Sequence, residues 1–474
     1  MSSLHEECGV FGIYSNDESL DVVSAAHHGL FALQHRGQES CGIYVSDRGV
    51  PTGYKARGLV GDVFTKDVLA GLGQGRMALG HVRYGTAASN RSRDAQPVHV
   101  NHSNGSLVVA HNGCITNAGE LRRRYEMEGC IFHTTSDTEV IAYTITRERI
   151  RCGSIEEAVY NAMDQLEGAF SMVMMSSRKL IACRDTRGFR PLCIGMIGDS
   201  YVVASESCAL DAVGAKFLRD IAPGEIVIID REQGLRTDMR RCEEQEKKRL
   251  CVFEYIYFAR PDSVVEGHSV HLSRVMAGQI LAKEYPVEAD VVIGVPDSGL
   301  DAAIGYAKGS GLPYAIGLIK NKYIGRTFIQ PVQSQRADSV RIKLNPVAAV
   351  LKGKRVVVVE DSIVRGTTFE NLIALLRDAG ATQVHVMSAS PPYVYPCYYG
   401  TDVKSRESLI ANQYKSPEEI AKAIGADSVG YLPFEALPRL ICPGQGICTS
   451  CFTGDYPVRV SSEPVRSRFE EKLG

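Results

Sequence analysis

Two acidic residues, Glu360 and Asp361, follow directly after four consecutive valines at residues 356–359. A run that is apolar on both faces is typical of a central parallel strand, so the acids stand where such a strand leaves its sheet. Open α/β sheets bind ligands at this edge, and carboxylates there suit sugar hydroxyls or Mg²⁺. The pair therefore predicts a binding site. The alternative is an ordinary turn with a solvated acid pair.

A short polar turn separates the acid pair from a predicted helix. It consists of Ser362, Ile363, Val364, Arg365, Gly366, Thr367 and Thr368. Apolar residues at positions 369, 372, 373 and 376 follow helical spacing, Thr367 and Glu370 are spaced as a capping box, and Gly380 is placed to end the helix. Free backbone N–H groups beside Gly366, which has no side chain, suit a phosphate. The ligand predicted here is a phosphorylated sugar.

A second turn of this kind lies between another predicted strand and helix. It contains Asp297, Ser298 and Gly299, small or polar residues that let backbone N–H groups approach an oxygen-rich ligand. Two such turns in one sheet predict two phosphate groups.

Residues 320–343 hold six basic side chains, Lys320 and Lys322 among them, against one acidic side chain, Asp338. The segment has a local charge of +5 in a chain of net charge -2, which is more than a face exposed to solvent requires. The length and polarity of the segment suit a lid over an anionic ligand. A nucleic-acid patch is the alternative.

Cys8 begins a predicted strand and, taken alone, is best interpreted as a small buried hydrophobic residue. Four later segments change this interpretation. They are residues 34–40, with Arg36 and Gly37; 80–86, with Arg83; 111–113, with Asn112 and Gly113; and 136–139, with Asp137. Taken singly, Arg83 could be a structural ion pair, Asp137 a helix cap and Asn112-Gly113 a plain turn.

In order and spacing these segments resemble the class II glutamine amidotransferases, whose nucleophile is an N-terminal residue. The resemblance implies that Cys8 is the nucleophile and that Asn112 and the Gly113 N–H form the oxyanion hole. It also implies that the glutamine is held in a pocket formed by Arg83, Asp137, Arg36 and Gly37. A free α-amino group has a pKa of about 7.7–8.0 and suits proton transfer at neutral pH. Cys8 gains one only if residues 1–7 are removed, so we expect these residues to be a propeptide.

The valine strand with its turn resembles the phosphoribosyl-pyrophosphate signature of the type I phosphoribosyltransferases, and residues 296–299 resemble their pyrophosphate loop. The implied binding set is Asp297, Ser298, Gly299, Lys320, Lys322, Glu360, Asp361, Ser362, Val364, Arg365, Gly366, Thr367 and Thr368, with Ser298, Glu360 and Asp361 also on Mg²⁺. In the resembling amidotransferases two aspartates are common where this chain has Glu360-Asp361, which leaves the exact metal geometry open.

Together the two halves resemble the glutamine phosphoribosylpyrophosphate amidotransferases over nearly the whole chain. The resemblance implies that ammonia from glutamine is channelled, under a lid that includes residues 323–328, to displace pyrophosphate and give 5-phosphoribosylamine, the first committed step of purine synthesis. It also implies purine nucleotides as feedback inhibitors and a homotetramer. A non-catalytic regulator would need no glutaminase half, and an amidotransferase with another acceptor would not need two phosphate turns.

The chain has fourteen cysteines and no export signal, so a disulfide framework is not expected. Cys448 and Cys451 form a C-x₂-C pair, which is a sign of metal or cluster binding. Spacing alone leaves Cys242, Cys251, Cys397 and Cys442 as candidate partners. Resemblance to the iron-sulfur branch of the family implies that Cys251, Cys397, Cys448 and Cys451 bind a [4Fe-4S] cluster. A structural zinc ion is the alternative.

The elements that must position these residues fall into two domains. We expect an α+β N-terminal-nucleophile domain (an αββα sandwich) at residues 8–240, with two helical segments, and an α/β phosphoribosyltransferase domain with a parallel sheet at residues 250–474. A charged connector or surface helix is expected at residues 231–250. In the second domain strands are expected at 290–295 and 313–319 around a helix at 300–307.

The 53 basic and 55 acidic residues offer no overall field for nucleic acid or anionic lipid. With no apolar stretch approaching a membrane span, we expect a cytoplasmic protein.

Overall fold

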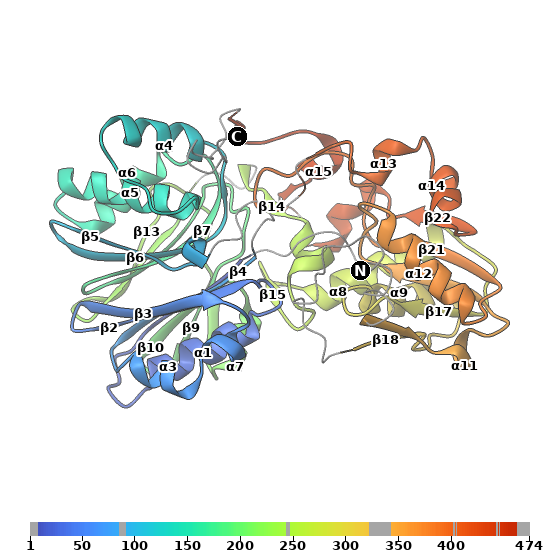
Figure 1. Ribbon diagram of the computed structural model, residues 1–474, viewed down its shortest axis with the longest axis horizontal. Helices are drawn as coiled ribbons and strands as arrows, with labels where there is room; N and C mark the ends of the chain where they lie inside the picture. Colours follow the sequence, from blue (N-terminus) through green and yellow to red (C-terminus); the bar gives the residue numbers. More distant parts are fainter. Residues whose placement is uncertain are drawn as a thin grey trace, which may run out of the picture.

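The computed structural model describes residues 8–84, 92–242, 247–321, 343–401, 403, 405–441, 444 and 446–461. Figure 1 shows an N-terminal part, coloured blue to green, beside a C-terminal part, coloured yellow to red. The chain returns to the N-terminal part near its end, where Arg459 Nη2 lies 2.7 Å from a carboxylate oxygen of Glu120. Among the described helices, none is long and apolar enough to cross a membrane.

The N-terminal part contains two antiparallel sheets, described here in spatial order. The first is β11 (Lys216–Asp220), β9 (Cys193–Ile197), β10 (Ser200–Ala204), β1 (Gly9–Tyr14), β4 (Met77–Arg83), β2 (Ser40–Asp47) and β3 (Val50–Arg57). The second is β13 (Gly234–Asp238), β12 (Ile226–Asp230), β8 (Leu180–Arg184), β7 (Gly168–Ser176), β6 (Gly105–Ile115) and β5 (Val98–His102).

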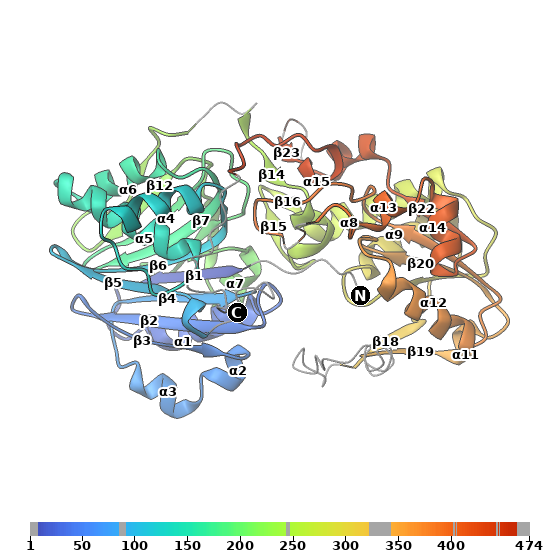
Figure 2. The same ribbon diagram turned by 45° about the horizontal axis from the view of Figure 1, so that its top comes forward.

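Helices cover the outer face of each sheet. Beside the first sheet lie α1 (Val22–Ala32), α2 (Val60–Val63), α3 (Lys66–Gly71) and α7 (Ser207–Ala212); beside the second lie α4 (Ala118–Met127), α5 (Asp137–Arg151) and α6 (Ile155–Met163). A short 3₁₀ turn, η1, spans Ser92–Asp94. The layers are visible on the left of Figure 2. The N-terminal part is therefore the αββα sandwich that the sequence predicted.

Strand β1 shows how the sequence builds these layers. All six of its residues are buried. Phe11 and Ile13 pack with the helices of the first sheet, whereas Val10 and Tyr14 pack against the second sheet. Because successive side chains of a strand point to opposite faces, an apolar run fits a strand that is covered on both sides.

Two expectations for the N-terminal part need correction. Seven α-helices are described here rather than two helical segments. Residues 231–250 are not simply a connector, because β13 within them pairs antiparallel with β12 and forms an edge of the second sheet. The charged side chains of this edge strand are partly buried in ion pairs, Arg236 with Asp230 and Asp238 with Arg240, and they hid its strand pattern.

The C-terminal part is built on a parallel sheet in the order β17 (Val291–Gly294), β20 (Arg355–Glu360), β21 (Gln383–Ser388) and β22 (Ser428–Tyr431). Its longer helices are α8 (Val270–Glu284), α9 (Leu300–Ser310), α12 (Thr367–Asp378) and α14 (Pro417–Ile424). Val357 and Val359 pack on the α8 and α9 side, and Val356 and Val358 on the α12 side. The valine run is an inner strand, as predicted.

Shorter elements surround this sheet. They are β14 (Leu250–Cys251), the π-helix η3 (Glu254–Phe258), β15 (Val264–Val265), β16 (His268–Ser269), β18 (Leu318–Lys320), β19 (Leu344–Pro346), α11 (Ala348–Leu351), α13 (Ile410–Gln413), η4 (Phe434–Leu440), β23 (Ile447–Cys448) and α15 (Ser450–Thr453).

Two local predictions in the C-terminal part were wrong. Residues 313–319 do not form a sheet strand: Tyr314 makes one isolated bridge to Val292, and β18 pairs antiparallel with β19 outside the parallel sheet. The capping box at the start of α12 is also absent, since the N-cap is Gly366, at φ 76°, with no side-chain cap. Gly366 occupies a backbone conformation that a threonine would rarely adopt.

Candidate functional site

The predicted glutamine-site residues come from the ends of four elements. Cys8 directly precedes β1, and Arg83 ends β4, which pairs with β1 so that Gly9 is opposite Val82. The other sheet contributes β6, and α5 begins beside it. His81 Nε2 donates to the carbonyl oxygen of His111 at 3.1 Å, so β4 and β6 are joined directly across the two sheets. This bond fixes the Arg83 and Asn112 strands relative to each other.

Asn112 and Gly113 lie at the inner end of β6. The Asn112 side chain is 1% exposed, and neither its oxygen nor its nitrogen has a hydrogen-bond partner among the described residues. Gly113 has φ 133°, and a Cβ there would lie 2.1 Å from the Ala169 carbonyl oxygen. Only glycine fits this position. A buried amide without a partner is costly, so the arrangement suits a ligand oxygen that would satisfy it.

Asp137 is the first residue of α5, and the helix cap is Ser136, whose hydroxyl accepts from the N–H of Thr138. The Asp137 carboxylate accepts from the Ile115 N–H at 3.2 Å and lies 3.5 Å from His111 Nε2. Burial raises the pKa of Asp137, but His111, the Ile115 N–H and Arg83 outweigh it, and the net pKa is lowered. Asp137 is therefore an ionised carboxylate, suited to an ammonium group.

Arg36 lies beside Cys8, but its guanidinium is committed to carboxylates. Arg36 Nε donates to the Cys8 carbonyl oxygen at 3.1 Å, Nη1 donates to Glu206 at 2.5 Å, and Nη2 donates to Glu254 at 2.8 Å. These three side chains are fully buried. Glu254 belongs to η3, so the contact crosses from one part of the chain to the other. Gly37 packs on the backbone of Arg83, where a Cβ would come within 2.6 Å.

The acid pair at the end of β20, Glu360 in the strand and Asp361 just after it, is buried at the edge of the parallel sheet. Asp361 accepts hydroxyl hydrogens from Ser298 and Ser362, each at 2.5 Å. Glu360 is 1% exposed, and its Oε2 has no hydrogen-bond partner in the described part of the chain. Burial, followed by the neighbouring Asp361, raises the pKa of Glu360 well above its usual value. A cation or a sugar hydroxyl at this position would satisfy the orphaned oxygen, so these residues fit a Mg²⁺-bound sugar.

The predicted pyrophosphate turn lies against the acid pair. A Cβ on Gly299 would come within 2.5 Å of the Val359 carbonyl oxygen, so glycine lets the turn reach the end of β20. Asp297 pairs with Lys320, which brings the first lysine of the basic segment to the same turn. Val364 is bonded through its carbonyl oxygen to the Ile410 N–H, and Arg365 is partly exposed beside it. The structure thus brings together the two turns for which the sequence predicts phosphate binding.

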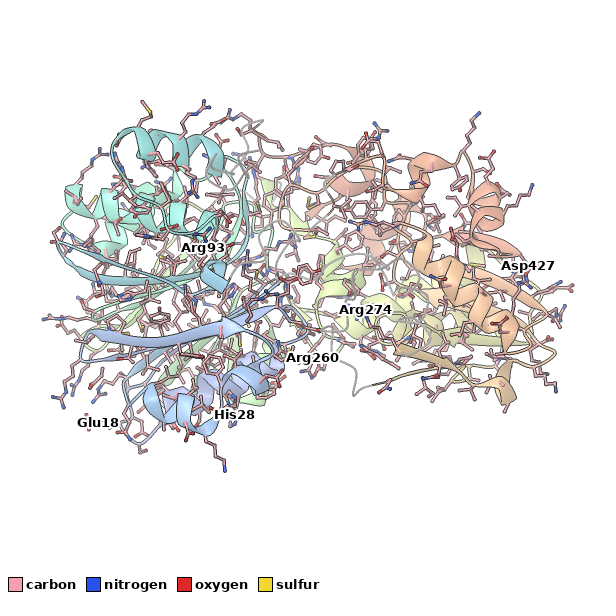
Figure 3. All side chains as sticks on the ribbon, viewed as in Figure 1. Glu18, His28, Arg93, Arg260, Arg274 and Asp427 are labelled. Atoms are coloured by element: carbon pink, nitrogen blue, oxygen red, sulfur yellow. The ribbon has the colours of Figure 1, made fainter. Side chains whose placement is uncertain are left out.

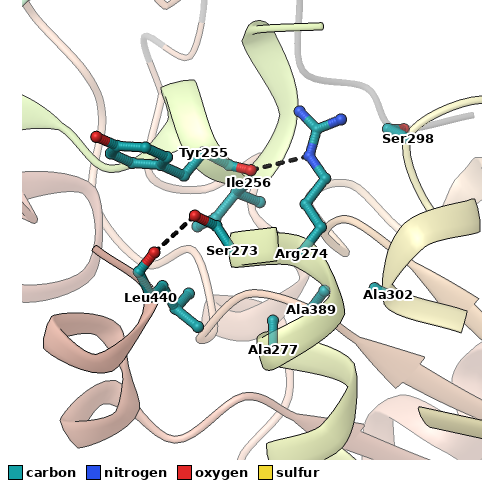
Figure 4. A pocket seen from close by; sticks show the side chains of 9 residues that line it. All are labelled: Tyr255, Ile256, Ser273, Arg274, Ala277, Ser298, Ala302, Ala389 and Leu440. Atoms are coloured by element: carbon teal, nitrogen blue, oxygen red, sulfur yellow. Dashed lines mark hydrogen bonds between the residues drawn. The ribbon is translucent and has the colours of Figure 1, made fainter. Parts of the chain in front are cut away.

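A small cavity lies between this turn and the π-helix (Figure 4). It holds about 10 Å³ of water-accessible space and is lined by Tyr255, Ile256, Ser273, Arg274, Ala277, Ser298, Ala302, Ala389 and Leu440. The buried Arg274 donates to the carbonyl oxygens of Tyr255, at 2.9 Å, and Ala259, at 2.7 Å. Arg260 and Arg274 both lie toward the junction of the two parts in Figure 3.

Four cysteines converge at the junction of the two parts. In the parallel pair of β14 and β23, Cys251 is the direct partner of Cys448. The Cys451 carbonyl oxygen accepts from the N–H groups of Val394 and Tyr395, which lead into Cys397. Burial raises the pKa of the Cys451 thiol, and the nearby thiols of Cys251, Cys448 and Cys397 raise it further.

Two other observations bear on what these cysteines could hold. Cys242, another candidate, instead contacts Met239. Within the described ranges no three His, Cys, Asp or Glu side chains are arranged around a single metal ion. The available donors are the four thiols, and thiolate is the ligand of iron-sulfur clusters as well as of structural zinc.

Some predicted residues lie outside the described ranges. These are the expected propeptide at residues 1–7, Lys322, the lid residues 323–328, and the candidate ligand Cys442. The backbone of Thr367 and Thr368 begins α12, but their side chains are not described.

Sequence reasoning missed three buried residues that join the sites. They are Glu254, Glu206 and Arg274. Glu206 also accepts from the Arg260 N–H and from the Ser263 hydroxyl. Each is an isolated charge within an apolar segment, and a buried charge requires a partner, but only the fold reveals which residue provides it.

Comparison with known proteins matches this architecture. A glutamine amidotransferase domain family matches residues 81–212, and a phosphoribosyl transferase domain family matches residues 267–390. Bacillus subtilis amidophosphoribosyltransferase is 46% identical over 100% of this chain and 98% of its own length. The Archaeoglobus fulgidus amidophosphoribosyltransferase is 47% identical over 96% of this chain and 99% of its own. The chain belongs to the amidophosphoribosyltransferase family.

Solved structures of the family have the same fold. The B. subtilis glutamine phosphoribosylpyrophosphate amidotransferase, complexed with ADP and GMP, covers 96% of this chain and 98% of its own with 45% identity and a TM-score of 0.88. A second structure, of an allosteric regulatory enzyme of purine biosynthesis, covers 98% and 99% with 45% identity and a TM-score of 0.89. The family has a glutaminase domain followed by a phosphoribosyltransferase domain, which is the order found here.

Proposed function

We propose that this protein is a glutamine-dependent amidophosphoribosyltransferase, which makes 5-phosphoribosylamine and pyrophosphate from phosphoribosyl pyrophosphate and ammonia released from glutamine. The observation that carries the proposal is the presence of both sites in one chain. One part holds Cys8, just before β1, and the buried, unpaired Asn112 amide in β6. The other part holds two adjacent candidate anion turns with an acid pair.

Cys8 attacks the side-chain amide of glutamine and forms a γ-glutamyl thioester with release of NH₃. Asn112 and the Gly113 N–H stabilise the negative charge that develops on the amide oxygen. Asp137, whose pKa is lowered, holds the α-amino group of glutamine, and Arg83 holds its α-carboxylate. Arg36 and Gly37 act on this pocket by positioning the Cys8 and Arg83 backbones.

At the second site, Asp361 with Ser298 and Glu360 would hold the ribose hydroxyls and Mg²⁺. When bound, Mg²⁺ neutralises charge on the departing pyrophosphate. The backbone N–H groups of residues 362–368 hold the 5′-phosphate, and the 297–299 turn with Lys320 holds the pyrophosphate. Ammonia then displaces pyrophosphate at the anomeric carbon.

Ammonia must pass from one site to the other unprotonated, because ammonium is not a nucleophile. The small cavity between η3 and Ser298 is the candidate for part of this passage, which the lid would complete. By family resemblance, purine nucleotides inhibit the enzyme and the chain forms a homotetramer.

The converging cysteines support a [4Fe-4S] cluster bound by Cys251, Cys397, Cys448 and Cys451, with a structural or oxygen-sensing role because the reaction has no redox step. Cluster binding would tie β14 and β23 to the 394–397 segment. Iron and sulfide analysis of anaerobically purified protein tests this proposal, and zinc without sulfide would contradict it.

Removal of residues 1–7 would give Cys8 its own α-amino group as the base. Intact-mass measurement of active enzyme should therefore give a chain that begins at Cys8. Full glutamine-dependent activity in a chain that retains Met1 would contradict the propeptide.

The decisive experiment compares glutamine-dependent with ammonium-dependent pyrophosphate release in Cys8→Ala. We expect the variant to lose the first activity and keep the second. Cys41→Ala, at a buried cysteine in β2, is the matched control and should keep both. Retained glutamine-dependent activity in Cys8→Ala would refute the assigned nucleophile.

A further inference from the structure

The region of the four converging cysteines contains a buried tyrosine that lacks a hydrogen-bond partner. Tyr393 is 1% exposed, and its ring lies between Phe253 and Phe452, with centroid distances of 5.5 Å and 6.3 Å. Its hydroxyl has no partner among the described residues. Buried tyrosine hydroxyls normally find an acceptor, so the orphaned hydroxyl of Tyr393, beside the cysteines, leaves a donor for a ligand bound there.

Tyr393 lies close enough to three of the four thiols for their charge to act on its hydroxyl. Burial is the largest cause that raises the pKa of Tyr393, and the next causes are the thiols of Cys397, Cys451 and Cys251. The next two residues, Val394 and Tyr395, donate their N–H groups to the Cys451 carbonyl oxygen, each at 3.0 Å. The ring is therefore fixed to the backbone of the cysteines as well as wedged between aromatic rings.

The other polar groups near the cysteines already have partners. The Ser450 hydroxyl lies 3.3 Å from Cys448 Sγ, but its hydrogen goes to the Asp455 carbonyl oxygen at 2.6 Å. The Tyr399 N–H donates to Cys397 Sγ at 3.4 Å. Unlike the Ser450 hydroxyl, the Tyr393 hydroxyl has a hydrogen that is not yet donated within the described residues.

We propose that Tyr393 donates its hydroxyl hydrogen bond to a sulfur atom of the iron-sulfur cluster bound by Cys251, Cys397, Cys448 and Cys451. The inference rests on the cluster proposed above and adds a tuning residue to it. Hydrogen bonds to cluster sulfurs stabilise the more negative, reduced form. Tyr393 thus makes the cluster harder to oxidise and slows its loss in air.

The test compares Tyr393→Phe with wild type, both purified anaerobically. We expect unchanged iron and sulfide per chain and a more negative midpoint potential. Cluster absorbance should be lost in air about tenfold faster, the order of effect seen when a residue that hydrogen-bonds to a metal ligand is removed. Equal potentials and equal bleaching rates in the two proteins would overturn the inference.

The matched control is Tyr431→Phe, at another buried tyrosine of the same part whose hydroxyl also lacks a described partner. Tyr431 packs in the core on the α12 side of the sheet, away from the cysteines. Its variant should keep the wild-type potential and bleaching rate. An equal shift in both variants would mean a general loss of stability and would count against Tyr393.

Two results separate this inference from the proposals beneath it. If anaerobic wild-type protein holds no iron and sulfide, the cluster proposal and the role of Tyr393 are both refuted. Glutamine-dependent synthesis by the same sample is a separate test of the proposed enzyme activity. If Tyr393→Phe does not assemble a cluster, 3-fluorotyrosine placed at position 393 replaces it. A more acidic phenol should then raise the midpoint potential, and an unchanged potential would contradict the hydrogen bond.

Discussion

Arg36 Nη2 donates to Glu254 Oε1 at 2.8 Å, and through this pair the loop beside Cys8 is joined to the first residue of the π-helix. Arg190 Nη1 lies 3.5 Å from the same oxygen, so one buried carboxylate faces two buried guanidinium groups. Because η3 also lines the cavity beside Ser298, the pair joins the surroundings of Cys8 to an element that borders the 297–299 turn.

Glu254→Gln should destabilise the protein and uncouple the two reactions. The substitution leaves Arg36 and Arg190 with less compensating charge, and breaking such a buried pair costs about 3 kcal/mol. We expect a larger loss of glutamine-dependent than of ammonium-dependent synthesis, since Arg36 also holds the Cys8 carbonyl. Denaturant unfolding and the two assays measure these effects. Glu288→Gln, at an exposed partner of Arg355, should change neither. Equal loss of both activities in Glu254→Gln would argue against coupling through this pair.

Asp361→Asn should weaken phosphoribosyl pyrophosphate binding by about tenfold or more, because it removes the charge that Ser298 and Ser362 orient. The KM for this substrate should rise in the ammonium-dependent assay, which bypasses Cys8. Glu370→Gln makes the same charge change at an exposed position of α12 and should leave the KM unchanged. A wild-type KM in Asp361→Asn would remove this residue from the site.

Gly278→Ala should destabilise the packing of α8 against α9. A Cβ at residue 278 would lie 1.9 Å from the Ala302 carbonyl oxygen, which is backbone and cannot move aside cheaply. We expect a loss of about 2 kcal/mol in the free energy of unfolding. Gly71→Ala in α3, with nothing within 4 Å, should instead stabilise by about 0.5 kcal/mol. Similar stabilities for the two variants would contradict the close approach of the helices.

Asp220 should make stability depend on pH. Burial, followed by Glu266, raises its pKa to about 7, against the opposing effects of Arg184 and of the N–H groups of Glu266 and Gly267. A carboxyl group with a raised folded-state pKa keeps its proton longer in the folded than in the unfolded protein. The free energy of unfolding therefore falls as pH rises from the pKa of Asp220 in the unfolded chain toward its folded-state pKa of about 7.

Asp220→Asn removes this titration. Its unfolding free energy should rise relative to that of wild type by about 2 kcal/mol between about pH 5 and pH 8. Asp211→Asn, at an exposed position of α7, should show no such trend. A constant difference between Asp220→Asn and wild type across this range would contradict the raised pKa.

Local pattern was enough to locate most chemistry-bearing segments. The valine run predicted β20 and its acid pair because a strand covered on both faces must be apolar throughout. Ser154 caps α6 by accepting from the Glu157 N–H, and this spacing is visible in the sequence. By contrast, the cap of α12 depends on the left-handed backbone of Gly366, and β13 depends on pairing with β12, and neither has a local signature.

The sequence by itself predicted the order of the two domains and located the candidate turns and strand ends, because each turn and each strand end is specified by adjacent residues. Only the tertiary structure decided that Arg36 bonds to Glu254, that Ser298 reaches Asp361, and that Tyr393 is buried near the cysteines without a hydrogen-bond partner. These relationships join residues far apart in the chain. They depend on which buried charges and hydroxyls find partners after folding, and burial makes that pairing necessary without indicating the partner in the sequence.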